Sequence, residues 1–143
     1  MMSSDSLVLA LGSNLSDRAG WIARAERLLE EEFGPMAYRS ETKETQAIGF
    51  DGPPFLNAIA VFHCSMEPLD ALAVCKRIER ALGRNDSAEY DSFGNRKYHD
   101  RIIDIDILFY GERKLCTREL VIPHPAVNSR PFINELLLTL RPL

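Results

Sequence analysis

At 143 residues the chain is long enough for one domain with a buried core, and its composition, 45% hydrophobic and 27% charged, is that of an ordinary globular protein. A formal net charge of −4 excludes a general nucleic-acid-binding protein, and no apolar run reaches the roughly 20 residues that a membrane span needs. We therefore expect a single domain over residues 1–143, without nucleic-acid or membrane partners. We also expect a monomer, although neither composition nor charge bears on oligomeric state.

Cysteine usage and the first residues indicate where the protein works. The three cysteines (Cys64, Cys75 and Cys116) are odd in number and widely spaced, which favours reduced thiols over disulfides or a zinc site. The opening residues, Met-Met-Ser-Ser-Asp-Ser, lack the basic and apolar regions of a secretory signal. Both observations predict a cytoplasmic protein.

The first two elements are predicted to be a strand and a helix. Residues 7–11 are a short apolar run typical of a buried strand, and Gly12-Ser13-Asn14 ends it as a strand-to-helix turn. Ser16 or Asp17 can cap a helix that ends at Gly34-Pro35. Apolar side chains recur in this helix with helical spacing, at Trp21, Ala25, Leu28 and Leu29.

The middle of the chain predicts two strands, a long loop and a second helix. We expect a strand over residues 36–42, a polar loop rich in Gly and Pro over 41–54, and an apolar strand over 55–63. Pro68 opens a helix that Gly83 ends, with an apolar stripe at Ala71, Val74, Cys75, Ile78 and Leu82. Residues 84–100 are polar, and a connection of that length is usually a functional lid or disordered.

The last part of the chain predicts a strand and a helix. The strand over residues 101–110 is rich in Ile, Leu, Phe and Tyr and ends at Gly111. A short segment then reaches Ile122, Pro123-His124-Pro125 breaks the chain, and residues 132–140 predict a final helix. The order β-α-β-β-α-β is that of a ferredoxin-like α+β sandwich, with helices on one face of an antiparallel sheet and the other face left for a ligand.

The strand over 101–110 contains two carboxylates in the pattern Asp104-Ile105-Asp106. Strand side chains alternate between faces, so both aspartates point away from the face of Ile103, Ile105 and Ile107, and their Cα atoms lie about 6–7 Å apart. Two negative charges in an apolar strand favour a cation between them, and Mg²⁺ prefers one or two carboxylates plus substrate phosphates. Two solvated surface carboxylates are the alternative interpretation.

The distribution of charge favours a metal–polyphosphate ligand. Residues 1–75 carry a net charge of −6, whereas residues 76–143 carry +2 and contain both aspartates. The chain has no glycine-rich phosphate loop, so a bound nucleotide would depend on metal ions and arginines. Arg84, Arg101 and Arg130 suit phosphate because the guanidinium is planar and always charged, although each can equally be a surface charge.

Four further residues can serve either structure or ligand binding. His124 lies between two prolines that fix its backbone. Asn57 lies within an apolar strand, where its amide needs partners or a ligand. Phe55 and Phe132 are core residues by default, but either ring can stack on a flat heterocycle.

Taken together, these motifs resemble the bacterial 6-hydroxymethyl-7,8-dihydropterin pyrophosphokinase family of the folate pathway. The matching pieces occur in the family's order and cover nearly the whole chain: Leu9-Ala-Leu-Gly-Ser-Asn-Leu15, Phe55-Leu-Asn57, Arg77-Ile-Glu79, Gly83-Arg84, Arg101-Ile-Ile-Asp-Ile-Asp106, Pro123-His124 and Arg130-Pro-Phe132. The R-x-x-D-[IL]-D strand followed by P-H and a later R-x-F is the most specific part.

The resemblance implies transfer of pyrophosphate from ATP to the pterin hydroxymethyl group, with release of AMP. It implies two Mg²⁺ ions on Asp104 and Asp106, with Arg84 and Arg101 as mobile catalytic contacts to the phosphates. By the same resemblance, the nucleotide contacts are Glu79, Ile107, His124 and Arg130. The implied pterin contacts are Gly12, Thr45, Gln46, Ile48, Phe55, Asn57, Tyr98 and Phe132.

The chain departs from the family pattern just before the acidic strand. The family commonly has R-W-G-P-R, whereas this chain has Lys97-Tyr98-His99-Asp100-Arg101, in which Tyr98 keeps a ring that can stack on a pterin. Phe55 also replaces a usual Tyr. Two alternatives therefore stand beside an active enzyme: a degenerate homologue that binds pterin or nucleotide without turnover, and an unrelated metal-dependent nucleotidyltransferase.

Overall fold

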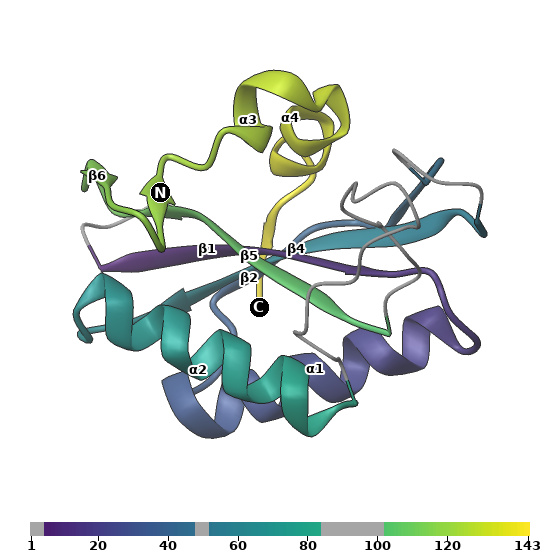
Figure 1. The fold of residues 1–143 in the computed structure, drawn as a ribbon, viewed down its shortest axis with the longest axis horizontal. Helices are drawn as coiled ribbons and strands as arrows, with labels where there is room; N and C mark the ends of the chain where they lie inside the picture. Colours follow the sequence, from purple (N-terminus) through teal and green to yellow (C-terminus); the bar gives the residue numbers. More distant parts are fainter. Residues whose placement is uncertain (1–4, 48–51, 84–101) are drawn as a thin grey trace, which may run out of the picture.

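A computed structural model describes residues 5–47, 52–83 and 102–143 of the chain (Figure 1). Its elements, in chain order, are β1 (Ser6–Ser13), α1 (Arg18–Phe33), β2 (Tyr38–Arg39), β3 (Lys43–Thr45), β4 (Phe55–His63), α2 (Pro68–Ala81), β5 (Asp104–Tyr110), β6 (Leu115–Cys116), β7 (Val121–Ile122), α3 (Ala126–Ser129), α4 (Pro131–Leu137) and β8 (Arg141–Pro142). No helix among the described residues is long and apolar enough to cross a membrane.

The centre of the molecule is an antiparallel sheet with the strand order β5-β1-β4-β2-β8, in which β3 also pairs with β4. The helices α1 and α2 cover one face, and the short helices α3 and α4 lie over the other (Figure 1). We expected the second face to be left open for a ligand. That expectation is wrong for part of the face, because Ile133 and Leu136 of α4 are buried in a cluster with sheet residues.

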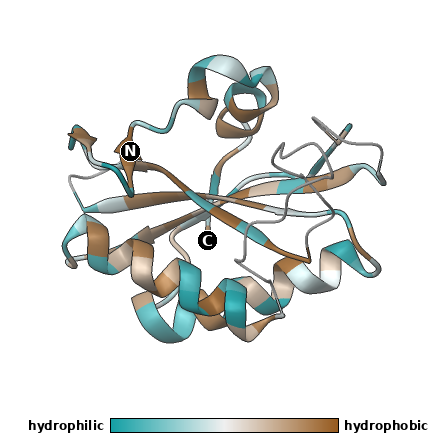
Figure 2. Cartoon of the chain, viewed as in Figure 1, coloured by the Kyte–Doolittle hydropathy of each residue, from teal (hydrophilic) through white to brown (hydrophobic). Residues whose placement is uncertain are grey.

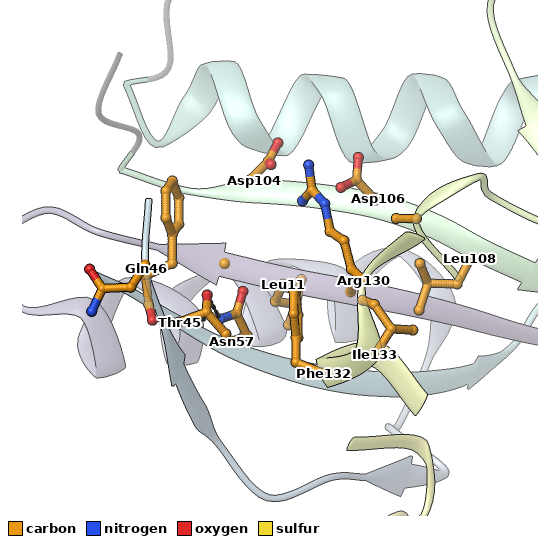
Figure 3. Close-up of a pocket in the computed structure, with 14 residues that line it drawn as sticks. Leu11, Thr45, Gln46, Asn57, Asp104, Asp106, Leu108, Arg130, Phe132 and Ile133 are labelled. Atoms are coloured by element: carbon orange, nitrogen blue, oxygen red, sulfur yellow. Dashed lines mark hydrogen bonds between the residues drawn. The ribbon is translucent and has the colours of Figure 1, made fainter. Parts of the chain in front are cut away.

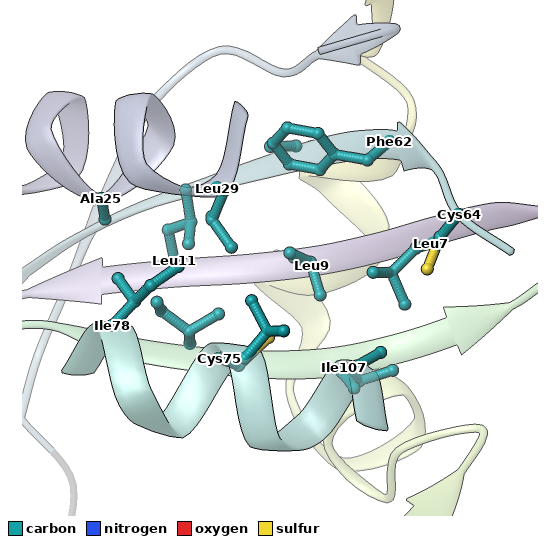
Figure 4. Packing of buried hydrophobic residues seen from close by; sticks show 14 of the residues in the cluster. Leu7, Leu9, Leu11, Ala25, Leu29, Phe62, Cys64, Cys75, Ile78 and Ile107 are labelled. Atoms are coloured by element: carbon teal, nitrogen blue, oxygen red, sulfur yellow. The ribbon is translucent and has the colours of Figure 1, made fainter. Parts of the chain in front are cut away.

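The main core lies between the sheet and the helices α1 and α2. Leu7, Leu9 and Leu11 of β1 point into it and are at most 1% exposed. They meet Leu29 of α1 and Ile78 of α2 (Figure 4). The central strands are largely hydrophobic, whereas much of the outer helix surface is hydrophilic (Figure 2). Burial of this apolar surface is the dominant favourable contribution to folding.

Both long helices begin and end close to the predicted residues. Asp17 caps α1, where its Oδ1 accepts a hydrogen bond from the backbone N–H of Gly20 at 3.1 Å. Gly34 ends this helix with φ of 90°, a conformation that side chains with a Cβ rarely adopt. Pro68 is in the first turn of α2. The last helix is shorter than predicted, because α4 ends at Leu137 rather than at residue 140.

The strands differ from prediction at the end of β1 and in the segment before β4. β1 continues through Gly12 and Ser13 instead of ending at residue 11, and Gly12 pairs with both Asn57 and Asp104. The predicted loop over 41–54 contains a strand, β3, that pairs with the start of β4. Lys43 and Glu44 are exposed in this edge strand, so no apolar alternation marks it in the sequence.

The predicted alternation along β5 is confirmed. Ile105 and Ile107 are buried on the helix side, whereas Asp104 and Asp106 are partly exposed. The register with β1 shifts so that Leu108 has no partner opposite it. Leu108 still follows the alternation and is buried beneath α4, and the bulge breaks the alternation at Phe109, which packs in the same cluster.

A partly buried ion pair ties α1 to β2. The guanidinium of Arg39 donates to both carboxylate oxygens of Glu26, at 2.9 and 3.2 Å, and the Glu26 side chain is only 11% exposed. Replacing Arg39 with methionine leaves this carboxylate without its cation, so we expect the free energy of unfolding in urea to fall by about 2 kcal/mol. The matched control is Arg77→Met, which breaks the exposed pair with Glu32 and should cost under about 1 kcal/mol. Equal losses would contradict this assignment.

Candidate active site

Two pockets meet at the paired carboxylates of β5. The first lies on the sheet face beside α4, and the second lies between α2 and the segment before α3. Asp104 and Asp106 line both pockets, so a ligand in one can share these carboxylates with a ligand in the other. The alternation of the strand, in regular register with β1 over these residues, is what brings both side chains to this boundary.

Besides β5, several parts of the chain build the first pocket (Figure 3). Gly12 and Asn57 come from the paired strands β1 and β4. The segment around β3 contributes Thr45 and Gln46, and the start of β4 contributes Phe55. The end of α3 and the start of α4 contribute Arg130, Phe132 and Ile133. Two aromatic rings therefore line one pocket, which gives a flat ligand two apolar faces to stack against.

Asn57 fixes the inner corner of this pocket. Its Nδ2 donates to the backbone carbonyl of Lys43 at 3.0 Å and to the hydroxyl of Thr45 at 2.8 Å. Its Oδ1 lies only 3.3 Å from the position that a Cβ on Gly12 would take. A glycine at position 12 therefore keeps space beside the amide, and the amide holds β3 against β4.

Two basic side chains approach the carboxylates. The guanidinium of Arg130 extends from the start of α4 toward Asp104 and Asp106 (Figure 3). The imidazole of His124 accepts a hydrogen bond at Nδ1 from the backbone N–H of Ala126 at 3.0 Å, so the neutral ring carries its proton on Nε2. That Nε2 is 3.9 Å from Oδ1 of Asp106. His124 thus presents a donor to the boundary between the two pockets.

The environment of His124 favours the neutral imidazole. Burial lowers its pKa below the ordinary value of about 6.5, the Arg130 guanidinium lowers it further, and the carboxylate of Asp104 opposes both. As the pH falls, His124 is therefore protonated in the unfolded chain at a higher pH than in the folded protein. The contribution of His124 to stability is complete above about pH 6.5 and is lost as the pH falls through the lowered pKa of the folded state.

We expect an NMR titration of His124 in the unliganded protein to give a midpoint below 6.5. Arg130→Gln should move that midpoint upward, because it removes the positive charge that disfavours the imidazolium. A midpoint above 6.5 in the wild-type protein, or a downward shift in the variant, would contradict the account of this environment.

Glu79 lies behind the carboxylates rather than among them. It is a residue of α2 that is 1% exposed, and its Oε2 accepts a hydrogen bond from the backbone N–H of Ile105 at 2.7 Å. That amide lies between Asp104 and Asp106 in the sequence. Glu79 therefore fixes the backbone at the start of β5, and with it the direction of both aspartates. It also lines the second pocket.

The second pocket holds several charged residues that sequence reasoning missed. Lys76, Arg118 and Glu119 line it together with His124 and Ile107. Ile107 is only 1% exposed and belongs mainly to the core. Lys76 and Arg118 carry no spacing signal in the sequence, since one is an ordinary charged helix residue and the other lies in a connection between two short strands.

Four predicted contacts (Arg84, Arg101, Ile48 and Tyr98) lie outside the described residues.

The donors at the boundary fit a metal that arrives with a phosphate ligand. Within residues 5–47, 52–83 and 102–143, no group of three or more His, Cys, Asp or Glu side chains could hold a metal ion. Mg²⁺ is usually bound by one or two carboxylates, with waters and substrate phosphates completing its six ligands. Asp104 and Asp106 match that partial donor set, and both remain accessible from two pockets.

Comparison with known proteins gives consistent matches over most of the chain. A family model described as 7,8-dihydro-6-hydroxymethylpterin-pyrophosphokinase matches residues 8–142. The 2-amino-4-hydroxy-6-hydroxymethyldihydropteridine pyrophosphokinase of Porphyromonas gingivalis is 38% identical over 136 residues, which cover 94% of this chain and 89% of that protein. The protein of the same name from Aquifex aeolicus is 35% identical and is covered over 79% of its length.

Longer proteins contain a similar region. The folate synthesis bifunctional protein of Arabidopsis thaliana is 34% identical over 130 residues, which are 90% of this chain and 25% of that protein. Among solved structures, an HPPK-DHPS in complex with substrates aligns with a TM-score of 0.53 and 16% identity, over 78% of this chain and 29% of that one. At this identity the structural likeness concerns the fold alone.

Proposed function

The chain belongs to the 7,8-dihydro-6-hydroxymethylpterin-pyrophosphokinase family, and we infer that it transfers pyrophosphate from ATP to the hydroxymethyl group of 6-hydroxymethyl-7,8-dihydropterin, releasing AMP. The observation that carries this conclusion is the pair Asp104 and Asp106, which line both pockets. A reaction between two substrates needs its reacting groups at one boundary, and the charge that develops there needs neutralising.

We assign the first pocket to the pterin. Phe55 and Phe132 supply apolar faces for a flat heterocycle, and Asn57, held by Thr45, supplies an amide for its polar edge. Gly12 and Gln46 complete the lining. Ile48 and Tyr98 stay predicted contacts from the family pattern.

We assign the second pocket to the nucleotide. His124 presents its Nε2 donor at the boundary, and Lys76 and Arg118 add positive charge around a polyphosphate. Arg130 extends toward the same carboxylates from the pterin side, which suits contact with the transferred phosphates more than with the base. Glu79 and Ile107 form the wall between α2 and β5. Arg84 and Arg101 stay predicted catalytic contacts to the phosphates.

The transfer forms one bond and breaks one. The pterin hydroxyl oxygen bonds to the β-phosphorus of ATP as the bond from that phosphorus to the oxygen of the α-phosphate breaks, so AMP leaves and the hydroxyl proton passes to solvent. Asp104 and Asp106 would hold two Mg²⁺ ions, which neutralise the phosphates and orient them. The protein's own contribution is positioning, through rigid β5 and the aromatic walls of the first pocket.

Three broader assignments complete the proposal. The core order β1-α1-β2-β4-α2-β5, with α1 and α2 on one sheet face, supports a ferredoxin-like sandwich. The family match over residues 8–142 supports one catalytic domain. All three cysteines are free thiols, which suits a reducing compartment such as the cytoplasm. That the protein acts as a monomer stays a prediction.

An assay of products tests this function directly. The protein is mixed with ATP, Mg²⁺ and the hydroxymethyl-dihydropterin, and the nucleotide products are separated. AMP is expected, together with the pterin diphosphate, and omission of Mg²⁺ should stop both. Formation of ADP would contradict pyrophosphate transfer. Binding of both substrates without any product would instead favour the degenerate homologue.

A further inference from the structure

The turn between β1 and α1 is hydrogen-bonded to the segment that leads into β4. Asn14 Nδ2 donates to the carbonyl oxygen of Pro53 at 3.1 Å, and Arg18 Nη1 donates to the carbonyl oxygen of Pro54 at 2.9 Å. Neither proline has an N–H, so a carbonyl is the one polar backbone group that each can offer for anchoring. The contacts join residues 39 and 36 positions apart.

Arg18 also contacts the other side of the same segment. Its Nη1 is 3.6 Å from Oε1 of Glu44, which lies in β3. One guanidinium nitrogen therefore touches the chain both before and after the connection from β3 to β4. Because Glu44 is 57% exposed, the attraction itself contributes little to stability, and the effect of this contact is mainly on position.

The neighbours of these anchor points line the first pocket. Thr45 and Gln46 follow Glu44 directly, and Phe55 follows Pro54. Any displacement of the Pro54 carbonyl is therefore passed to the backbone of Phe55. Asn14 and Arg18 are absent from the residues that line either pocket, and Asn14 is only 1% exposed. They cannot act by touching the ligand as the pocket stands.

We propose that Asn14 and Arg18 are positioning residues for the pterin, an inference that rests on the proposed function. They hold in place one wall of the first pocket, which is formed by Phe55, its strand partner Thr45 and the adjacent Gln46. The Gly12-Ser13-Asn14 motif thereby has two roles: its glycine leaves space in the pocket beside Asn57 and Phe55, and its asparagine anchors the segment that leads into Phe55.

The test compares Arg18→Met and Asn14→Ala with the control Arg27→Met, which changes an exposed arginine of the same helix. Each of the first two variants loses about one hydrogen bond, so the KM for pterin should rise about five- to tenfold, with kcat and the KM for ATP unchanged. Arg18→Lys keeps a cationic donor and should recover most of the affinity. The control should match the wild-type protein throughout.

A merely structural role predicts a different pattern. It would lower the unfolding midpoint of the variants, and it would either change the KM for both substrates or leave both KM values unchanged. Either result, in an active wild-type background, would overturn the positioning role. The failure of the proposed function is recognised separately, because then the wild-type protein itself forms no AMP. In that case calorimetric titration of the same four variants with pterin decides the inference: unchanged affinity, or no binding even by the wild type, overturns it.

Discussion

Replacing Asp106 with alanine is expected to abolish AMP formation while the protein stays folded. The carboxylate is one of only two side chains that line both pockets from the acidic strand, and its loss removes half of the proposed metal donors. Metal-ion stabilisation of transferred phosphates supplies several kcal/mol, which corresponds to a loss of about 10³-fold or more in kcat. Activity is measured as AMP released at saturating substrates.

The fold should tolerate this change because Asp106 is on the solvent-accessible face of β5, with a side chain that is 39% exposed. Circular dichroism and urea unfolding check that point. Asp106→Asn, which keeps the shape but not the charge, should lose nearly as much activity. Glu112→Gln, an exposed carboxylate in the turn after β5, is the control and should behave as wild type. Retention of more than about a tenth of the activity by Asp106→Ala would contradict the metal assignment.

Replacing Asn57 with alanine is expected to reduce kcat/KM for the pterin by about 10- to 100-fold. The variant loses the donors to the Lys43 carbonyl and the Thr45 hydroxyl, and it also loses the amide that we assign to the polar edge of the heterocycle. Leaving such polar groups unpaired costs about 1–3 kcal/mol. The KM for ATP should stay unchanged, because Asn57 lines only the first of the two pockets described here.

A second asparagine provides the control for this experiment. Asn134 of α4 also donates a side-chain hydrogen bond, to the carbonyl of Val127 at 2.9 Å, but it lies outside both pockets. Asn134→Ala should leave the steady-state constants for both substrates unchanged. If Asn57→Ala instead raised the KM for ATP as strongly as that for the pterin, the division of the site into two halves would be wrong.

The residues on β5 were the most predictable part of the site. Alternation in an apolar strand is enough to place Asp104 and Asp106 on one face, and the structure confirms that arrangement. The strand over residues 55–63 and the two long helices were equally predictable from the sequence, because their apolar periodicity is set by burial against one core.

The walls of the first pocket could not be predicted from pattern alone. β3 is a short, exposed edge strand whose place is fixed by Asn57 and Arg18, and such side-chain contacts over long sequence distances leave no local signal. The layer formed by α4 was missed for the same reason. The helix itself was predicted, but its packing on Val8 and Ile59 depends on tertiary contacts that no local pattern in the sequence marks. Glu79 was predicted at the nucleotide, yet its carboxylate bonds a strand amide.

The most direct test of the central claim follows the β-phosphorus of ATP. The wild-type protein is incubated with Mg²⁺, excess hydroxymethyl-dihydropterin and ATP labelled with ³²P at the β-position, and the products are separated. Pyrophosphate transfer at Asp104 and Asp106 predicts that the label moves wholly to the pterin, that AMP is unlabelled, and that Asp106→Ala prevents the movement. Label retained in ADP, or transfer that survives loss of Asp106, would contradict the account.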